Sequence, residues 1–228
     1  MTNVLNDPKL ERLIARLQQQ SSGQVKAMDK YFAEFARKTK PADRPAAAKK
    51  YLSDKLVALE PDKGEFCYQL CRALNARRIV EAGTSHGVST LYLAAAARDN
   101  SRAGGERAVV IGTEYEPAKV KAARANFAQA GLSEFIDLRE GDLRETLKDI
   151  GGPVDFALID IWEDMVLPAL KRVAPHLHPG SIVVADNTAT YRDQYVRNGY
   201  FKFIAVPANR LRTMTLPFRG GFELTVRV

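Results

Sequence analysis

RIVEAGTSHG, at residues 78–87, places a short β-branched run directly before a turn that contains two glycines. Val80 and its neighbours favour a strand, Gly83 ends it, and the Ala- and Leu-rich stretch 88–97 favours a helix. A strand that passes through a glycine turn into a helix is the repeating unit of α/β proteins. The segment therefore predicts a chain organised as alternating strands and helices.

This alternation continues through the centre of the chain. Further strands are expected at residues 108–113, 135–138, 154–159 and 181–185, and helices at 117–130, 143–149 and 165–174. Strands separated by helices indicate βαβ crossovers, and such crossovers give a parallel sheet that is buried on both faces. We therefore predict an α/β fold with a doubly wound, Rossmann-like sheet, and a polar surface loop at 99–106.

The N-terminal part shows only helical spacing and no strand. Two apolar faces can be recognised, one formed by Leu10, Leu13, Ile14 and Leu17 and the other by Met28, Tyr31, Phe32 and Phe35. Pro41 and Pro45 interrupt the pattern, which resumes at 46–59, and another helix is expected at 63–74. Residues 1–60 are therefore expected to form a helical extension that serves as a lid or a dimer surface, ahead of a domain at 61–228.

The C-terminal part breaks the alternation in another way. Residues 200–206 and 222–228 are expected strands with no amphipathic helix between them. Two strands without a crossover helix favour an antiparallel hairpin added to the edge of the sheet. The predicted sheet is thus mostly parallel with an antiparallel C-terminal hairpin.

Composition narrows the class of protein. The chain has 228 residues, of which 46% are hydrophobic and 27% charged, the balance of a soluble globular protein. No run approaches the roughly 20 apolar residues of a membrane span and the N-terminus has no secretory pattern, so the cytoplasm is expected. The net charge of +7 fits a solvated surface and leaves an RNA partner open. Cys67 and Cys71 lie on one helix face and are expected as buried thiols.

Acidic residues follow several of the predicted strands. Glu114 ends the second strand, Asp142 follows the third, Asp160 ends the fourth, and Asp186 with Asn187 ends the fifth. Ligands of open α/β sheets bind beyond the carboxyl ends of the strands, so these side chains mark a candidate site. The spacing of the two turn glycines differs from the G-x-G-x-x-G of dinucleotide-binding turns, which disfavours a nicotinamide dehydrogenase. His86 in that turn is expected to be exposed.

Four motifs carry a resemblance to a known family. They are residues 61–64 (PDKG), 80–89 (VEAGTSHGVS), 158–164 (LIDIWED) and 184–187 (VADN). In this combination, residues 61–228 resemble the divalent-cation-dependent O-methyltransferases typified by the catechol and caffeoyl-CoA enzymes. The resemblance implies a class I methyltransferase domain that binds S-adenosylmethionine.

The resemblance also implies roles for individual residues. Gly83, Ser85 and Ser89 would hold the methionine end of the cofactor, Glu114 its ribose, and Asp142 and Trp162 its adenine. The further cofactor-binding residues expected from the matching motifs are Lys63, Glu81, Thr84 and Asp160.

Asp160, Asp186 and Asn187 match the metal ligands of the family, and Mg²⁺ or another divalent cation is expected. Two carboxylates and an amide oxygen at neighbouring strand ends suit a hard cation. A bound Mg²⁺ would orient vicinal hydroxyls and favour the deprotonated oxygen that accepts the methyl group. The chain therefore predicts methyl transfer to a hydroxyl of a small aromatic or vicinal-diol acceptor.

Two positions depart from the family pattern. The family has a lysine as general base three residues after the first metal-binding aspartate, where this chain has Glu163. Glu163 is either the base, or unnecessary because a metal activates the substrate, or a contact to a different substrate. Near the end, Arg219-Gly220-Gly221 stands where many relatives have Asp-Gly before the last strand, with Phe218 alongside, and this basic, aromatic character indicates an anionic or aromatic acceptor. Asp160 and Glu163 are the candidate catalytic residues.

Other functions remain open at this level. The positive charge would suit a tRNA-modifying methyltransferase, and Glu163 in place of lysine would suit a cofactor-binding protein that has lost turnover. The partners expected are a small-molecule acceptor and a second copy in a homodimer, with no membrane.

Overall fold

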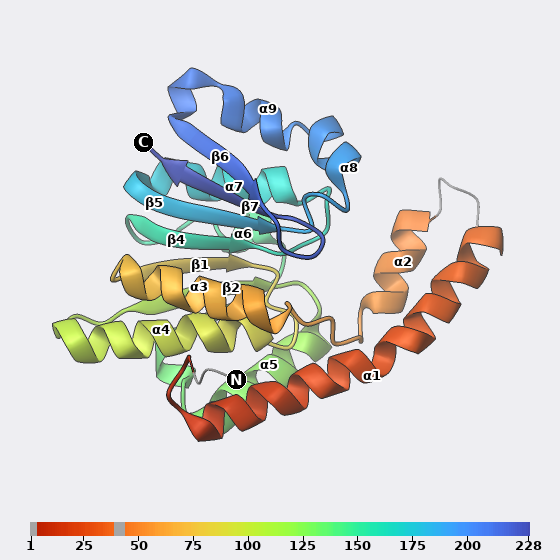
Figure 1. Ribbon diagram of the computed structural model, residues 1–228, viewed down its shortest axis with the longest axis horizontal. Helices are drawn as coiled ribbons and strands as arrows, with labels where there is room; N and C mark the ends of the chain where they lie inside the picture. The colour runs from red at the N-terminus through yellow and green to blue at the C-terminus, as the bar shows by residue number, and fades with distance from the viewer. Residues whose placement is uncertain (1–3, 39–43) are drawn as a thin grey trace.

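The computed structural model describes residues 4–38 and 44–228, and its centre is a seven-stranded sheet in the order β3-β2-β1-β4-β5-β7-β6 (Figure 1). The strands are β1 (Arg78–Ala82), β2 (Val109–Glu114), β3 (Ile136–Glu140), β4 (Val154–Ile159), β5 (Leu177–Asp186), β6 (Leu211–Leu216) and β7 (Phe222–Arg227). Strands β1 to β5 run parallel, whereas β7 pairs antiparallel with both β5 and β6. The predicted α/β sheet with an antiparallel C-terminal hairpin is confirmed.

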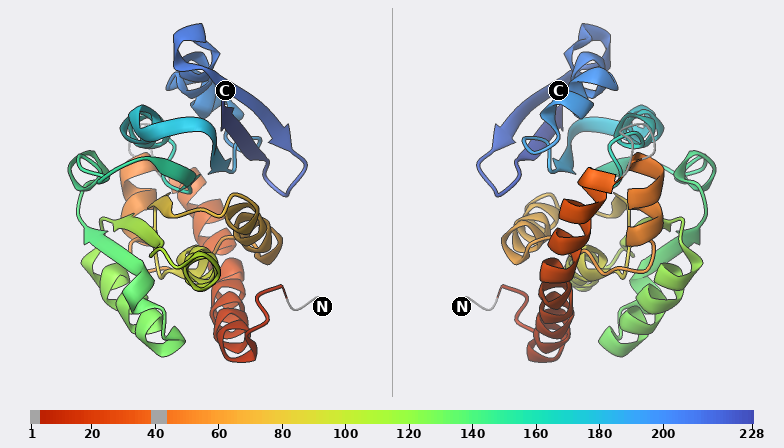
Figure 2. Two further views of the ribbon diagram at one scale, coloured as in Figure 1. Left: turned by 90° about the vertical axis from the view of Figure 1, so that its left-hand side faces the viewer. Right: turned by 90° about the vertical axis from the view of Figure 1, so that its right-hand side faces the viewer.

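Helices cover both faces of this sheet (Figure 2). They are α1 (Pro8–Lys38), α2 (Arg44–Leu52), α3 (Pro61–Ala73), α4 (Val88–Gly104), α5 (Pro117–Ala130), α6 (Leu143–Thr146), α7 (Val166–Val173), α8 (Arg192–Arg197) and α9 (Tyr200–Ala205). Short 3₁₀ turns lie at Ser133–Phe135, Ala174–His176 and Pro207–Asn209.

Two hydrophobic clusters follow from the period of two along each strand. Ile79 and Val110 pack into the cluster covered by α1, α3, α4 and α5, whereas Val80 and Ile111 pack into the cluster covered by α6 to α9. Strands β1, β2 and β4 are buried on both faces along most of their length and are mostly apolar, whereas the edge strand β3 is largely exposed. The polar residues are left for the strand ends, where the candidate site lies.

Helix α1 has a buried half and a half-buried one. Leu10, Leu13, Ile14 and Leu17 are all buried, and this half packs against α4 and α5. The second face is only half-buried, and its Tyr31 ring stacks on Tyr51 of α2 with centroids 3.5 Å apart. These rings hold α2 beside the C-terminal part of α1, and the pair extends past the sheet in Figure 1.

The two prolines expected to interrupt the N-terminal helices have different outcomes. Pro41 lies outside the described residues. Pro45 does not interrupt a helix, because it occupies the first turn of α2, where a missing backbone N–H breaks no helical hydrogen bond. The helical pattern expected at 46–59 ends at Leu52, and residues 53–60 connect α2 to α3 without regular structure. Cys67 and Cys71 are free and buried in α3, as predicted.

Two expected elements were wrong. Residues 200–206 form helix α9 rather than a strand, because Tyr200 and Ile204, four residues apart, point into the core together. The hairpin partner of β7 is instead β6. The loop expected at 99–106 is helical as far as Gly104, because the Asn100 amide donates to two buried carbonyls, those of Cys71 and Ala76.

The remaining differences are shifts of boundaries. Helix α6 ends at Thr146 rather than at residue 149, β3 extends to Glu140, and β5 begins at Leu177 rather than at residue 181. Three expected elements match to the residue, β1, α5 and β4.

Candidate active site

The turn after β1 forms the centre of the candidate site. Gly83 has φ +99°, and a Cβ atom added there would lie 2.0 Å from the backbone oxygen of Asp160. Only glycine lets this turn pass so close to the end of β4. The backbone N–H groups of Gly83 and Thr84 both donate to the carbonyl of Thr113, which ties the turn to β2 as well.

Glu114 at the end of β2 holds the same turn in place. Its Oε2 accepts the backbone N–H of Ser85 at 2.7 Å, and its Oε1 accepts the N–H of Glu116 at 2.9 Å. Each carboxylate oxygen keeps a further lone pair for a ligand hydroxyl. Glu114 is therefore both a support of the turn and a candidate acceptor of ligand hydrogen bonds.

Glu81 lies beneath the turn and is fully buried. Its Oε2 accepts hydrogen bonds from the hydroxyls of Thr84, at 2.8 Å, and Thr90. Burial raises the pKa of Glu81, and hydrogen bonds from Thr90, Ser89 and Thr84 oppose that rise. Glu81 and Thr84 thus brace the turn from inside.

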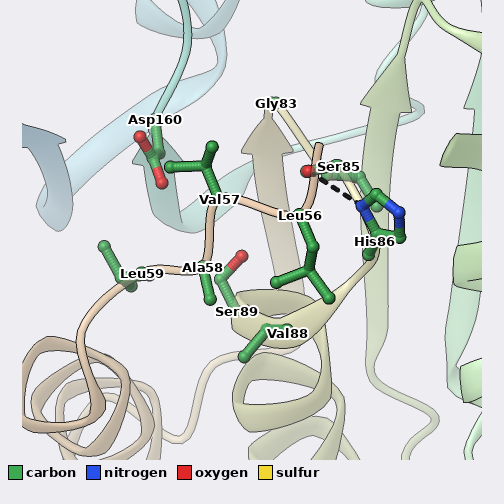
Figure 3. Close-up of a pocket in the computed structure, with 11 residues that line it drawn as sticks. Leu56, Val57, Ala58, Leu59, Gly83, Ser85, His86, Val88, Ser89 and Asp160 are labelled. Carbon is green, nitrogen blue, oxygen red and sulfur yellow. Dashed lines mark hydrogen bonds between the residues drawn. The ribbon is translucent and has the colours of Figure 1, made fainter. Parts of the chain in front are cut away.

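A pocket lies in front of the turn (Figure 3). It is lined by residues 56–59, residues 83–86, Val88, Ser89 and Asp160. Ser89 sits in the first turn of α4, whose N-terminus begins at the pocket. The end of β4, the β1 turn and the segment before α3 therefore meet at one place.

Two parts of this pocket were not expected from the sequence. Residues 56–59 lie outside the matched motifs, and only their position before α3 brings them to the turn. His86 was expected to be exposed, but it is half-buried and lines the pocket. Burial lowers the pKa of His86, and the nearby positive charge of Lys119 lowers it further. No sequence signal distinguished His86 from an ordinary turn residue.

Asp160 and Asp186 follow the paired residues Ile159 and Ala185 at the ends of β4 and β5, so the structure brings them together. Asp160 lines the pocket, whereas Asp186 is buried with 5% of its surface exposed. Burial raises the pKa of Asp160 well above its usual value, and the nearby charge of Asp186 raises it further.

Lys63 lies against this acidic pair. Its side chain is fully buried, and its Nζ donates to Oδ1 of Asp186 at 2.5 Å and lies 2.9 Å from Oε2 of Glu60. Burial lowers the pKa of Lys63, but the bonds to Asp186 and Glu60 outweigh burial and hold the pKa above its usual value. Lys63 was expected to contact a cofactor, and its contacts here are to carboxylates of the chain.

The loop after β4 carries Trp162 and Glu163, which are both half-buried. Lys49 of α2 reaches this loop, donating to Asp164 at 2.8 Å and lying over the Trp162 ring at 5.6 Å. The amide of Asn198 donates to the backbone carbonyl of Glu163 at 2.5 Å. Helix α2 therefore touches the loop that holds both candidate catalytic residues.

Two other expected positions have structural contacts of their own. The Asp142 side chain caps α6 by accepting the backbone N–H of Arg144 at 2.8 Å, and it also pairs with the Arg144 guanidinium. Those bonds lower the pKa of Asp142. Phe218 packs against Phe66 at 5.3 Å and Phe222 at 5.6 Å, while the neighbouring Arg219 is exposed.

Comparison with known proteins gives consistent findings. Residues 80–188 match a family model described as a methyltransferase domain. The chain is 31% identical over 132 residues to a catechol O-methyltransferase of Mycobacterium tuberculosis, covering 58% of this chain and 57% of that protein. It is 28% identical over 139 residues to a caffeoyl-CoA O-methyltransferase of Pinus taeda, covering 58% of this chain and 51% of that one. The matches thus span little more than half the length of these relatives.

A solved structure is similar along nearly the whole chain. An O-methyltransferase of Bacillus cereus in complex with SAH superposes with a TM-score of 0.67 at 22% identity, covering 93% of this chain and 100% of that one. At this identity the likeness establishes the fold. Together, the comparisons confirm the resemblance to catechol and caffeoyl-CoA O-methyltransferases that the four motifs indicate.

Proposed function

We propose that this protein, whose residues 80–188 match a methyltransferase-domain model, transfers a methyl group from S-adenosylmethionine to a hydroxyl of a small metabolite. The observation that carries the proposal is the meeting of the β1 turn, Glu114 and Asp160 at the carboxyl edge of the sheet. Open α/β sheets bind their ligands at this edge, and each of the three elements is held there by backbone contacts. The acceptor is proposed to be aromatic or a vicinal diol.

The residues around the pocket fit the cofactor. The N-terminus of α4, with Ser85 and Ser89 beside it, would receive the methionine carboxylate, since helix N-termini favour anions. Glu114 would accept the ribose hydroxyls with its remaining lone pairs. Asp142 and Trp162 are proposed to border the adenine.

The bound cofactor supplies an electrophilic methyl group, so that the acceptor oxygen forms the new O–C bond while the electron pair of the C–S bond stays on sulfur. The chain must align the acceptor and receive the hydroxyl proton. We propose Asp160, which lines the pocket, as the group that orients the reacting centre. Glu163, three residues further along the same loop, is proposed as the base.

A resident Mg²⁺ is a separate question, because two of its three predicted ligands, Asp186 and Asn187, are already hydrogen-bonded to each other, and Asp186 also pairs with a lysine. Asp186 accepts from Lys63 on Oδ1 and from the Asn187 amide on Oδ2. Coordination of a divalent cation needs oxygens that converge on one empty point. The side chains present do not fit that requirement, and no step of the proposed transfer passes through a metal.

Helix α2 and residues 56–59 are proposed to act as a cover over the acceptor. The contacts of Lys49 with Asp164 and Trp162, and the position of residues 56–59 in the pocket wall, support this role. The half-buried rings around Tyr31 would suit a dimer surface, which we propose as the second role of these helices.

Within residues 4–38 and 44–228, none of the helices has the length and apolar character required to span a membrane. We propose a cytoplasmic location, which the two free buried thiols of Cys67 and Cys71 support.

The test is release of S-adenosylhomocysteine with a panel of catechols and hydroxycinnamoyl compounds, run beside calorimetric binding of S-adenosylhomocysteine. We expect Glu114→Ala to weaken that binding by about 10- to 100-fold, since it removes hydrogen bonds to a charged acceptor. Glu140→Ala is the matched control, because Glu140 ends the neighbouring strand β3 with an exposed side chain. Equal affinities in the two variants would contradict the assignment of Glu114.

Glu163→Gln in the same assay tests the proposed base. We expect kcat to fall about 100-fold or more while cofactor binding is retained. An intact protein that binds S-adenosylhomocysteine but turns over no small acceptor would favour tRNA as the acceptor, which salt-dependent tRNA binding would show, or a lost activity.

A further inference from the structure

A lysine occupies the position next to the acidic pair at the ends of β4 and β5. Lys63 is fully buried, and its ammonium is 2.5 Å from Asp186 and 2.9 Å from Glu60. The Phe222 ring closes another side, with its centroid 5.7 Å from the Lys63 nitrogen. A positive charge without solvent access is stable only when carboxylates surround it in this way.

The neighbouring amide is also turned away from metal coordination. The Nδ2 of Asn187 donates to Oδ2 of Asp186 at 2.8 Å. A Cβ atom added at Gly220 would lie 2.6 Å from Oδ1 of Asn187, so the amide oxygen faces the Gly220 backbone. Ala189 and Thr190 donate their N–H groups to the Gly220 carbonyl, which fixes this loop against residue 220.

These contacts have a simple electrostatic consequence. Both oxygens of Asp186 already accept hydrogen bonds from donors of the same chain, and the nearest donor is a full positive charge. A divalent cation bound to Asp186 would share its ligand with that ammonium and be repelled by it. Neutralising the carboxylate needs one positive charge, and Lys63 supplies it.

We propose that the Lys63 ammonium takes the place of the divalent cation, so that this protein carries out methyl transfer without a metal. The inference rests on the proposed function and deepens it. An acceptor that chelates a metal offers two adjacent oxygens, whereas an acceptor held by side chains alone needs a single hydroxyl. The substrate class therefore includes aromatic compounds with one ring hydroxyl.

The decisive experiment is direct titration of the intact protein with Mn²⁺, followed by the electron paramagnetic resonance signal of the free ion. We expect no stoichiometric binding to the unmodified protein at millimolar Mn²⁺. We expect Lys63→Gln, which frees the carboxylates of Asp186 and Glu60, to bind Mn²⁺ about tenfold more tightly or better. Lys148→Gln is the control, because Lys148 pairs with Glu145 on the surface of α6, away from the site.

Thermal unfolding gives a second readout that does not depend on turnover. Lys63→Gln should melt at a lower temperature than the unmodified protein and regain stability when Mn²⁺ is added. Lys63→Arg keeps the positive charge, so Mn²⁺ should not raise its melting temperature. If Lys63→Gln does not fold, the Mn²⁺ titration of the unmodified protein decides alone. One Mn²⁺ bound at micromolar concentration and lost in Asp186→Asn would overturn the proposal.

Cofactor and acceptor measurements separate this proposal from the proposed function. If the unmodified protein does not bind S-adenosylhomocysteine, the proposed function is refuted. The Mn²⁺ titration then still tests whether the Lys63 ammonium excludes a divalent cation. Turnover that continues in EDTA with a hydroxycinnamoyl compound carrying one ring hydroxyl supports the proposal. Turnover restricted to catechols and abolished by EDTA would overturn it.

Discussion

Replacing Gly83 by alanine should damage both the fold and the site, and the size of the effect can be worked out from the structure. At φ +99°, an added Cβ would lie 2.0 Å from the Asp160 backbone oxygen and 2.9 Å from its carbonyl carbon. The left-handed backbone costs about 1–2 kcal/mol for a residue with a Cβ. The overlap with backbone atoms, which cannot rotate away, adds about 1–3 kcal/mol.

We therefore expect Gly83→Ala to lower the free energy of unfolding by about 2–5 kcal/mol, measured by urea denaturation. Gly131→Ala is the matched control, since Gly131 has φ +70° and no atom within 4 Å of the added Cβ, and it should lose only about 1–2 kcal/mol. Because the overlap displaces Asp160 from the pocket, methyl transfer should fall about 100-fold in Gly83→Ala alone. Equal losses of stability in the two variants, with intact turnover, would refute this reasoning.

Two further predictions concern regions outside the pocket. Asp7 accepts the Leu10 N–H at the start of α1 and pairs with Arg98 at 2.6 Å, so Asp7→Ala should lower the free energy of unfolding by about 1–3 kcal/mol. Asp7→Asn keeps the cap and should lose less free energy of unfolding than Asp7→Ala in urea denaturation. Equal losses in the two variants would count against a stabilising role of the cap. Asp155 raises the pKa of His178, so this contact stabilises the fold fully below pH about 6.5 and less as pH rises through the folded-state pKa. His178→Gln should remove that decline from the stability–pH profile, and an unchanged profile would speak against it.

The central sheet was predictable because its signals are local. Strand β4 and helix α5 match to the residue, since proline and glycine punctuate both: Pro153 precedes β4, Pro117 starts α5 and Gly131 ends it. The order of the parallel strands then places Glu114, Asp160 and Asp186 at one edge without further information. The position of these acids follows from topology alone.

The misses involve information that a local pattern does not contain. The run at residues 200–205 is aromatic and suggests a strand, yet Tyr200 and Ile204 are buried together as neighbours on a helix. The polar residues at the end of α4 led to a predicted helix that is too short. The carbonyls to which Asn100 donates belong to residues 24 and 29 positions away, so a local pattern does not reveal them. Tertiary contacts overrode local propensity in both places.

The same limit explains Lys63. Its partner Asp186 lies 123 positions away, so the sequence could not show that an ammonium meets the expected metal ligands. The motif around Lys63 suggested a cofactor contact, and the charge on a helix face is ordinarily solvated. Only the packing of α3 against the carboxyl edge turns this lysine inward.

The two halves of the site differ in how much a family resemblance can say about them. The proposed cofactor half consists of the β1 turn and Glu114, and it lies inside the matched residues 80–188. The wall at residues 56–59, Lys49 of α2 and Lys63 all lie outside that match. A relative can therefore share the proposed cofactor half and accept a different substrate, because part of the proposed acceptor wall, residues 56–59 and Lys49, comes from segments outside the match. It follows that exchanging residues 56–59, which line the pocket together with the β1 turn, should change acceptor preference, and that the search for the acceptor should start from this wall.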